Sequence, residues 1–557
     1  MNKVWWKEAV AYQIYPRSFM DSNGDGIGDL KGIIQKLDYL KDLGIDVLWI
    51  SPFYKSPNDD CGYDISDYCD IMDEFGTMAD FDLLLSEVHK RGMKLIADLV
   101  INHTSDEHPW FIESRSSLDN PKRDWYIWRD GKDGAEPNNW ESIFSGSAWE
   151  YDDETKQYYM HLFSKKQPDL NWENEEVRQA LYDMVNWWLD KGIDGFRVDA
   201  ISHIKKEEGL SDLPNPTGLK YVSSFEKHMN VEGIHPLLED LKKNTFDKYD
   251  IMTVGEANGV KIEDAELWVG EQEGKFNMVF QFEHLGLWKD NGESGKDIIG
   301  LKQILSKWQK GLYNKGWNAL YIENHDLARI VSTLGDDELY WKESATSLAV
   351  MYFLMQGTPF IYQGQEIGMT NVHFKTVEEY QDVQSTGLYY SKLEQGMAHE
   401  DIMEIIWATA RGNSRTPMQW DETVNGGFSS GTPWLAVNPN YKEINVAQQL
   451  ADEGSILNFY KKMIQLKKSH DVFTYGEYDL TLDNHPAIYA YTRTLDHEQV
   501  LILSNLTDQE VAFELEKMNL VFDQLMLSNY KVEEHEPMMK GTLKPYEARV
   551  YRIKDKQ

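Results

Sequence analysis

The stretch Gly192-Ile193-Asp194-Gly195-Phe196-Arg197-Val198-Asp199-Ala200 predicts a short buried strand with an acidic residue near its end. The apolar run over residues 195–200 has the length of a buried parallel strand, and Gly192 suits the C-cap of a preceding helix. Arg197 and Asp199 are two residues apart, so on a strand both side chains leave the same face. A guanidinium beside a carboxylate favours the ionised form that a nucleophile requires; a structural ion pair is the alternative.

Composition narrows the class of protein. The 557 residues are too many for one ordinary domain, and 41% hydrophobic with 13% aromatic residues permit a large core. A formal net charge of -37 argues against nucleic acid or a membrane as partner and makes a phosphorylated substrate less expected. No apolar run resembles a signal peptide or a membrane span, and only Cys61 and Cys69 occur. We therefore expect a cytoplasmic protein.

Short apolar strands alternate with amphipathic helices along most of the chain. We expect helices over residues 30–43, 79–91, 175–191, 298–312 and 340–355. The strand candidates are residues 9–15, 46–50, 94–101, 195–200, 251–254, 279–282, 320–322 and 360–362. Eight such strands predict an α/β fold of the (β/α)8 TIM-barrel type, with a doubly wound open sheet as the rival. The barrel is favoured because polar residues cluster after the strands, where a barrel places its active site.

Two segments interrupt or follow this alternation. Residues 104–172 are rich in Trp, Gly, Asn and Asp, with little helical period, and predict an inserted irregular β-rich subdomain after the third strand. From residue 472 the pattern changes to alternating strands, which predicts a C-terminal antiparallel β domain over 472–557. The barrel then comprises residues 1–103 and 173–471.

Three acidic residues fall at or after strand ends: Asp199, Glu256 and Asp326. The pair Asn102-His103 follows another strand. Carboxylates that converge with histidines and an arginine on one barrel face indicate glycoside cleavage, in which one carboxylate attacks and another protonates the leaving oxygen. A metal site is the rival use of these residues. It is less favoured because an arginine among them disfavours a cation, and no HExxH spacing occurs.

These residues also carry a family resemblance over essentially the whole chain. The sequence resembles the α-amylase superfamily, glycoside hydrolase family 13, in the branch of oligo-1,6-glucosidases, maltases and related exo-acting α-glucosidases. The segment Gln167-Pro168-Asp169-Leu170-Asn171 resembles a signature of that branch. The other motifs are Asp98-Leu99-Val100-Ile101-Asn102-His103, Gly195-Phe196-Arg197-Val198-Asp199, Val254-Gly255-Glu256 and Asn324-His325-Asp326.

The resemblance implies a retaining α-glucosidase that acts on small α-glucosides as a monomer or homodimer. Asp199 would be the nucleophile that forms a covalent glucosyl-enzyme, and Glu256 the general acid and then base. Asp326 would stabilise the transition state. Retention requires the Asp199 and Glu256 carboxyls to lie about 5–5.5 Å apart. Transglucosylation follows where a sugar hydroxyl replaces water.

The resemblance also implies a substrate pocket. His103, His325 and Arg197 would bind the hydroxyls of the glucose that is released, and Tyr63 would stack on its face. Asp60 and Arg411 would close the pocket behind this glucose, which makes the enzyme exo-acting. Further pocket residues implied are Arg415 at the entrance and Phe144, Phe163 and Phe282 as walls, with local packing as the alternative for each phenylalanine.

Linkage preference depends on Ala200. In this family a valine after the nucleophile accompanies α-1,6 cleavage and an alanine accompanies α-1,4, so a maltase-like preference is expected. The alternatives are an oligo-1,6-glucosidase, a trehalose-6-phosphate hydrolase or a sucrose isomerase. A non-catalytic carbohydrate-binding relative is remote, because this chain keeps the acidic residues.

The loop Asp21-Ser22-Asn23-Gly24-Asp25-Gly26-Ile27-Gly28-Asp29 begins like an EF-hand, but its twelfth position is Gly32 rather than Glu. The family has a structural Ca²⁺ or Mg²⁺ site here and needs no organic cofactor. A metal-free turn rich in Asp and Asn is the alternative. The ligands implied are the side chains of Asp21, Asn23, Asp25 and Asp29 and the carbonyl of Ile27.

Overall fold

Eight parallel strands form a barrel in this computed structural model, which describes residues 3–216, 218–288, 296–515, 520–532 and 540–555. The strands lie in the order β13-β12-β10-β5-β2-β1-β15-β14, and a parallel bridge between Val279 and Asn318 joins the two end strands. The predicted barrel is confirmed, and the open sheet is excluded. The strands are β1 (Ala11–Ile14), β2 (Val47–Ile50), β5 (Lys94–Val100), β10 (Gly195–Asp199), β12 (Met252–Ala257), β13 (Met278–Gln281), β14 (Ala319–Leu320) and β15 (Thr358–Tyr362).

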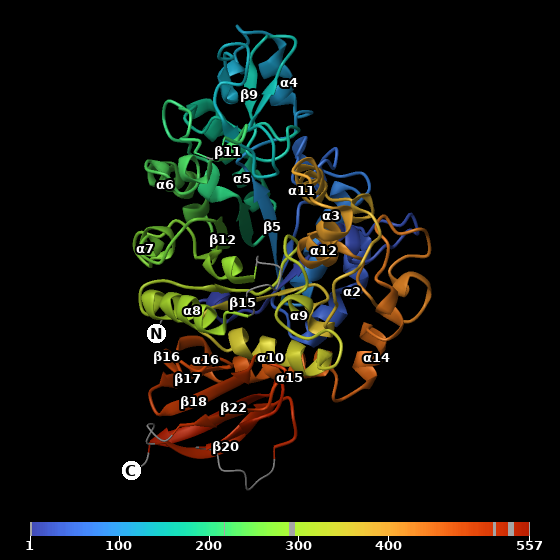
Figure 1. The fold of residues 1–557 in the computed structure, drawn as a ribbon, viewed down its shortest axis with the longest axis vertical. Coiled ribbons are helices and arrows are strands. Elements are labelled where there is room, and N and C mark those ends of the chain that lie inside the picture. Colours follow the sequence, from blue (N-terminus) through green and yellow to red (C-terminus); the bar gives the residue numbers. More distant parts are fainter. Residues whose placement is uncertain (1–2, 217, 289–295, 516–519, 533–539, 556–557) are drawn as a thin grey trace.

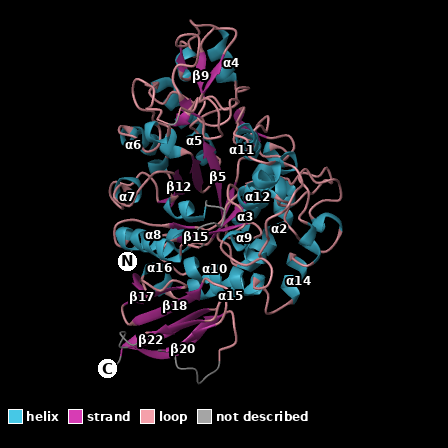
Figure 2. Cartoon of the chain, viewed as in Figure 1, coloured by secondary structure: helices cyan, strands magenta, loops and turns pink. Residues whose placement is uncertain are grey.

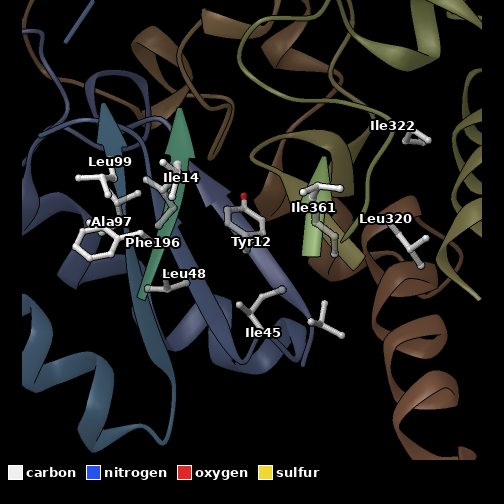
Figure 3. Close-up of a cluster of buried hydrophobic side chains, with 14 of the residues drawn as sticks. Tyr12, Ile14, Ile45, Leu48, Ala97, Leu99, Phe196, Leu320, Ile322 and Ile361 are labelled. Carbon is white, nitrogen blue, oxygen red and sulfur yellow. The ribbon is translucent and has the colours of Figure 1, made fainter. Parts of the chain in front are cut away.

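The side chains of β10 alternate between the helices and the barrel interior. Phe196 and Val198 belong to the core between strands and helices, part of which Figure 3 shows. The register sets Arg197 beside Asp98 of β5 on one side and beside Val254 of β12 on the other. Arg197 and Asp199 therefore meet the inward side chains of the neighbouring strands.

Helices surround the barrel (Figures 1 and 2). The predicted helices form within about two residues of their expected ends. The Asp29 side chain caps the first long helix by accepting from the Gly32 N–H, and Gly44 ends that helix at φ 102°. The helices that follow barrel strands include α2 (Leu30–Leu43), α3 (Met78–Lys90), α5 (Glu175–Asp190), α6 (Ile234–Asn244), α8 (Ile298–Leu312) and α10 (Trp341–Phe353), and α15 (Ile456–Ser469) packs against α10.

The segment between β5 and α5 stands at the upper end of the molecule in Figure 1. It holds α4 (Pro109–Ser116), the strand β7 (Trp140–Glu141) and a three-stranded antiparallel sheet in the order β6-β9-β8. The strands of that sheet are β6 (Trp128–Arg129), β8 (Trp149–Tyr151) and β9 (Tyr158–Met160). A bridge between His103 and Asp169 joins the two ends of this segment beside the barrel.

An antiparallel sheet in the order β16-β17-β18-β22-β20 ends the chain and lies below the barrel in Figure 1. This confirms the C-terminal β architecture expected from the alternating pattern. A separate pair, β19 (Val511–Glu514) and β21 (Lys540–Leu543), accompanies it. The sheet strands are β16 (Glu477–Thr481), β17 (Ile488–Leu495), β18 (Glu498–Asn505), β20 (Leu520–Ser528) and β22 (Ala548–Asp555).

Two helices after β15, α11 (Val383–Glu394) and α12 (His399–Thr409), were not expected from the sequence. Of the α11 residues only Ser385 is buried, so the helix lacks the apolar stripe on which helix prediction relies. The two helices pack on each other as a hairpin. Among the helices that the structure describes, none has the length and apolar character needed to cross a bilayer.

Candidate active site

A cavity of about 630 Å³ opens where the barrel strands end. Asp199 is the last residue of β10 and Glu256 the penultimate residue of β12, so both reach the cavity. Arg197, His325 and Arg415 are buried behind its wall. The predicted site residues that line the cavity are Asp60, Tyr63, His103, Phe144, Phe163, Asp199, Ala200, Glu256, Phe282, Asp326 and Arg411.

One guanidinium holds three carboxylates at the base of the cavity. Arg197 Nη1 donates to Asp98 Oδ1 over 2.8 Å and to Asp199 Oδ1 over 2.7 Å, and Nη2 donates to Glu256 Oε2 over 2.8 Å. Asp98, which the sequence reasoning did not assign to the site, is fully buried and also accepts from the Tyr63 hydroxyl over 2.9 Å. Asp98 begins the strand motif that ends in His103, and alternate residues of a strand share a face. Its position in that motif is the sequence signal that could have identified it.

Opposing effects act on the pKa of the Asp199 carboxyl. Burial and the facing Glu256 carboxyl raise the pKa of Asp199 well above its ordinary value, and Arg197 opposes them. Burial likewise raises the pKa of Asp98 to about 6. Arg197 brings the Asp199 and Glu256 carboxyls together, because its two Nη groups each bond an oxygen of one of them. Neighbouring carboxyls whose charges repel each other can divide the roles of attacking carboxylate and proton donor.

Asp326 is surrounded by positive charge and hydrogen-bond donors. Arg415 Nη2 donates to Asp326 Oδ1 over 2.8 Å, Arg411 Nη1 lies 3.3 Å from the same oxygen, and His325 Nε2 lies 3.1 Å from Oδ2. Burial alone would raise the pKa of Asp326, but His325, Arg411 and Arg415 lower it well below its ordinary value. Asp326 is therefore a carboxylate at neutral pH.

An ion pair between Asp60 and Arg411 forms part of the cavity wall. Arg411 Nη2 donates to Asp60 Oδ1 over 2.9 Å, and Gln167 Nε2 donates to Asp60 Oδ2 over 3.2 Å. Gln167 opens the motif that resembles a branch signature, and its contact with Asp60 gives that motif a place in the site. Asp382, a second residue that the sequence reasoning missed, pairs with Arg411 from behind.

Aromatic rings form much of the remaining wall. The Tyr63 ring lies parallel to the His325 ring, with centroids 5.2 Å apart. Phe144 and Phe163 meet edge to face at 5.5 Å, and the Arg411 guanidinium lies 5.0 Å from the Phe144 ring centroid. The wall thus combines flat apolar faces with hydrogen-bonding groups, as a sugar-binding pocket does.

A buried histidine, His203, lines the cavity beyond Ala200 and was also missed from the sequence. Its Nδ1 lies 2.9 Å from His228 Nδ1, and Ser224 Oγ lies 3.0 Å from His228 Nε2. Because the Ser224 hydroxyl donates to the Glu141 carbonyl, it accepts from His228 Nε2. His228 Nδ1 then accepts from His203 Nδ1, and His203 Nε2 is left as an acceptor.

The acidic loop at residues 21–29 is folded by its own side chains. Asp21 Oδ1 accepts from the N–H groups of Asn23 and Gly24, and Asp25 Oδ1 accepts from Ile27 N–H over 2.8 Å. In the described part of the chain no three His, Cys, Asp or Glu side chains converge as a metal site would require. The candidate metal-ligand atoms of this loop are all oxygens, which Ca²⁺ prefers. Metal binding here stays a prediction.

A TIM barrel whose strand ends bring carboxyls together in a cavity with aromatic walls defines the chain as a glycoside hydrolase. The family described as "Alpha amylase, catalytic domain" matches residues 13–476, and "Maltogenic Amylase, C-terminal domain" matches residues 479–550. The chain belongs to the α-amylase family.

Several relatives match over almost their full length. The chain is 60% identical to "Probable oligo-1,6-glucosidase 3" of Bacillus subtilis (strain 168), over 99% of this chain and 100% of that protein. It is 56% identical to the oligo-1,6-glucosidase of Parageobacillus thermoglucosidasius, with both chains fully covered. The crystal structure of Bacillus licheniformis trehalose-6-phosphate hydrolase matches with a TM-score of 0.91 and 45% identity, over 99% of this chain and 100% of that one.

Proposed function

We propose that this enzyme is a retaining, exo-acting α-glucosidase that releases glucose from the non-reducing end of short α-glucosides, with α-1,4 linkages favoured. The observation that carries the proposal is the pairing of Asp199 and Glu256 with one guanidinium, that of Arg197. Two neighbouring carboxyls can divide the roles of nucleophile and acid between them.

In the proposed reaction Asp199 attacks the anomeric carbon while Glu256 gives its proton to the glycosidic oxygen, and the leaving sugar departs. Glu256, now a carboxylate, takes a proton from water, whose oxygen displaces Asp199 and releases glucose. A sugar hydroxyl in place of water gives transglucosylation. The ionised Asp326 stabilises the positive charge that develops on the glucose ring.

Retention is supported by how closely the two carboxyls approach. An inverting enzyme needs a water molecule between its carboxyls and holds them about 6.5–9.5 Å apart, whereas a retaining enzyme holds them about 5–5.5 Å apart. Asp199 Oδ1 and Glu256 Oε2 accept from the two Nη groups of Arg197 over 2.7 and 2.8 Å, and this shared guanidinium holds the carboxyls close to each other.

Exo action is supported by the ion pair of Asp60 with Arg411 at the closed end of the cavity. Both side chains are buried, so separating Asp60 from Arg411 would leave a buried charge without its partner. A substrate chain cannot continue past this pair, and only a terminal glucose fits in front of it.

The proposed preference for α-1,4 linkages rests on Ala200, which lines the cavity together with His203 and Asn258. A small side chain there leaves room for the sugar on the leaving side, and an α-1,4-linked sugar is the expected occupant. The second candidate is an oligo-1,6-glucosidase, because two relatives with 56–60% identity carry that name. Both candidates use the same carboxyls and differ only in how the leaving sugar is seated.

A phosphorylated disaccharide is the third candidate, because a trehalose-6-phosphate hydrolase shares the fold. The described cavity wall carries four carboxyl side chains, from Asp60, Asp199, Glu256 and Asp326. Its lysine and arginine side chains are Lys392 and Arg411, and Arg411 is already paired with Asp60. A phosphate dianion would meet this acidic wall with little compensation, so neutral sugars fit better.

We also propose that the loop at residues 21–29 binds Ca²⁺ as a structural ion. The oxygen of Asn23 and the carboxylates of Asp21, Asp25 and Asp29 would hold it, together with the Ile27 carbonyl. The ion would fix the loop at the start of α2, away from the reacting carboxyls.

The test of the function is glucose release by the purified protein from maltose, isomaltose and trehalose-6-phosphate, with Asp199→Ala alongside. We expect maltose to be preferred by at least about tenfold in kcat/KM, and Asp199→Ala to lose about 10³-fold or more. Preference for isomaltose would replace the linkage proposal and keep the catalytic one. Hydrolysis of trehalose-6-phosphate alone would overturn the charge argument, and equal activity of Asp199→Ala would overturn the mechanism.

A further inference from the structure

Asp382 is a carboxylate that touches the active site only from behind. Its side chain is fully buried, and it does not line the cavity. Asp382 Oδ1 accepts from Arg411 Nε over 2.9 Å and from Arg411 Nη2, and the same oxygen lies 3.9 Å from Arg415 Nη1. It therefore stands behind both guanidiniums that contact Asp326.

The charges around these two arginines alternate. Arg411 pairs with Asp60 and Asp382 and lies near Asp326, and Arg415 pairs with Asp326. Burial alone would raise the pKa of Asp382, but Arg411 and Arg415 lower it below its ordinary value. Asp382 is thus ionised, and it accepts from Nε and Nη2 of Arg411, while Nη1 of the same guanidinium is directed to Asp326.

The second oxygen of Asp382 begins a helix. Asp382 Oδ2 accepts from Ser385 N–H over 3.0 Å and from the Ser385 hydroxyl, which caps α11. The α11 residues Gln384, Ser385, Leu388 and Lys392 line the cavity. One carboxylate therefore joins the α11–α12 hairpin to the closed end of the pocket.

We propose that Asp382 is a positioning residue that orients Arg411 toward the terminal glucose and locks the α11–α12 hairpin to the site. This inference rests on the proposed exo-acting function. Without Asp382, Arg411 keeps Asp60 and the longer contact with Asp326 but loses the partner that holds its Nε edge. The terminal glucose then loses an oriented donor in the ground state as well as in the transition state.

A helix cap alone would explain only half of these contacts. Serine and asparagine cap helices about as well as aspartate, so a pure cap would tolerate either residue. They cannot supply the negative charge that the two guanidiniums share, and removing one partner of a buried ion pair is strongly unfavourable. The two roles are therefore separable by substitution.

The experiment compares Asp382→Asn and Asp382→Ser, which keep a capping side chain, with a matched control, Asp297→Asn, at the aspartate that caps α8 and does not line the cavity. The readouts are the inhibition constant of glucose, the KM and kcat for maltose, and the Tm. For both Asp382 variants we expect the glucose inhibition constant and the KM to rise together by about tenfold, with a smaller change in kcat. Asp297→Asn should change both constants by less than about twofold.

Two outcomes would overturn the inference. One is a glucose inhibition constant within about twofold of the parent in whichever Asp382 variant folds, as judged by its Tm. The other is an equal rise of the glucose constant in Asp297→Asn, which would show that the effect does not come from the guanidinium contacts. Absence of glucose release by the parent enzyme would refute the proposed function instead, so the two failures are distinguishable.

Discussion

The backbone N–H of Ala200 donates a hydrogen bond to Glu256 Oε2 over 2.8 Å. Ala200 adopts φ 44° and ψ 29°, a left-handed conformation, directly after Asp199. The residue that follows the proposed nucleophile thus orients the proposed acid, and its side chain lines the same cavity. Ala200 is therefore expected to influence the proposed linkage preference through its side chain and the position of Glu256 through its backbone N–H.

Ala200→Val is expected to lower kcat/KM for maltose by about tenfold or more and to shift preference toward isomaltose, because the larger side chain narrows the leaving-sugar space. A β-branched residue is also strained at φ 44°, so the free energy of unfolding should fall by about 1–2 kcal/mol. Kinetics on both disaccharides and a urea titration measure these effects. Ala200→Gly is the control without strain; an unchanged ratio in Ala200→Val would contradict the argument.

Arg197→Lys is expected to reduce kcat by at least about 100-fold, because one ammonium cannot replace the two Nη groups that serve three carboxylates. Asp98, Asp199 and Glu256 would lose fixed donors, and the buried cluster would be destabilised. The control is Arg91→Lys, where the guanidinium bonds Asp38 and Glu87 at the surface. Equal, near-parent activity of the two variants would show that Arg197 is not central.

His108 predicts a pH dependence of stability. Burial lowers its pKa to about 3 in the folded protein, whereas an unfolded histidine has a pKa near its ordinary value of 6.5. The unfolded state then binds more protons between about pH 3 and 6.5, so the free energy of unfolding falls as the pH falls through that window. His108 Nδ1 caps α4 by accepting from Trp110 N–H, a contact that asparagine can replace.

From pH 7 to pH 5, His108→Asn should therefore lose about 2 kcal/mol less stability than the parent. Urea titrations at the two pH values measure the difference. His497→Asn, at an exposed position, is the control and should behave like the parent. Identical losses in His108→Asn and the parent would contradict the assignment.

Ca²⁺ is expected to raise the Tm of the metal-free protein, because an ion that binds only the folded loop stabilises it by mass action. Asp25 is exposed and bonds only within the loop, so Asp25→Ser should remove the shift and leave the fold intact. Thermal melts with chelator, Ca²⁺ and Mg²⁺ decide the matter. A Tm indifferent to both ions would leave the loop as a metal-free turn.

The barrel could be predicted from the sequence because its signals are local. Residues 195–200 show the apolar run of a buried strand, and Asp199 and Glu256 occur at strand ends. Asp98 became part of the site only through the register that pairs it with Arg197, which a single sequence does not show. The contact of Asp199 and Glu256 with the same guanidinium likewise depends on tertiary packing.

Asp382 and the α11–α12 hairpin could not be predicted for a different reason. The α11 helix buries a single residue, so it has no apolar period to recognise. Asp382 meets Arg411 across 29 positions of sequence, a separation that no local pattern reveals. Such residues are found only once tertiary structure brings them together.

Trapping the covalent glucosyl-enzyme is the direct test of the proposed role of Asp199 as nucleophile. The enzyme is incubated with a 5-fluoro-α-glucosyl fluoride, whose glucosyl-enzyme hydrolyses slowly, and its peptides are then analysed by mass spectrometry. We expect a fluoroglucosyl adduct on Asp199. An adduct on another carboxylate, or no adduct while the enzyme still hydrolyses maltose, would contradict it.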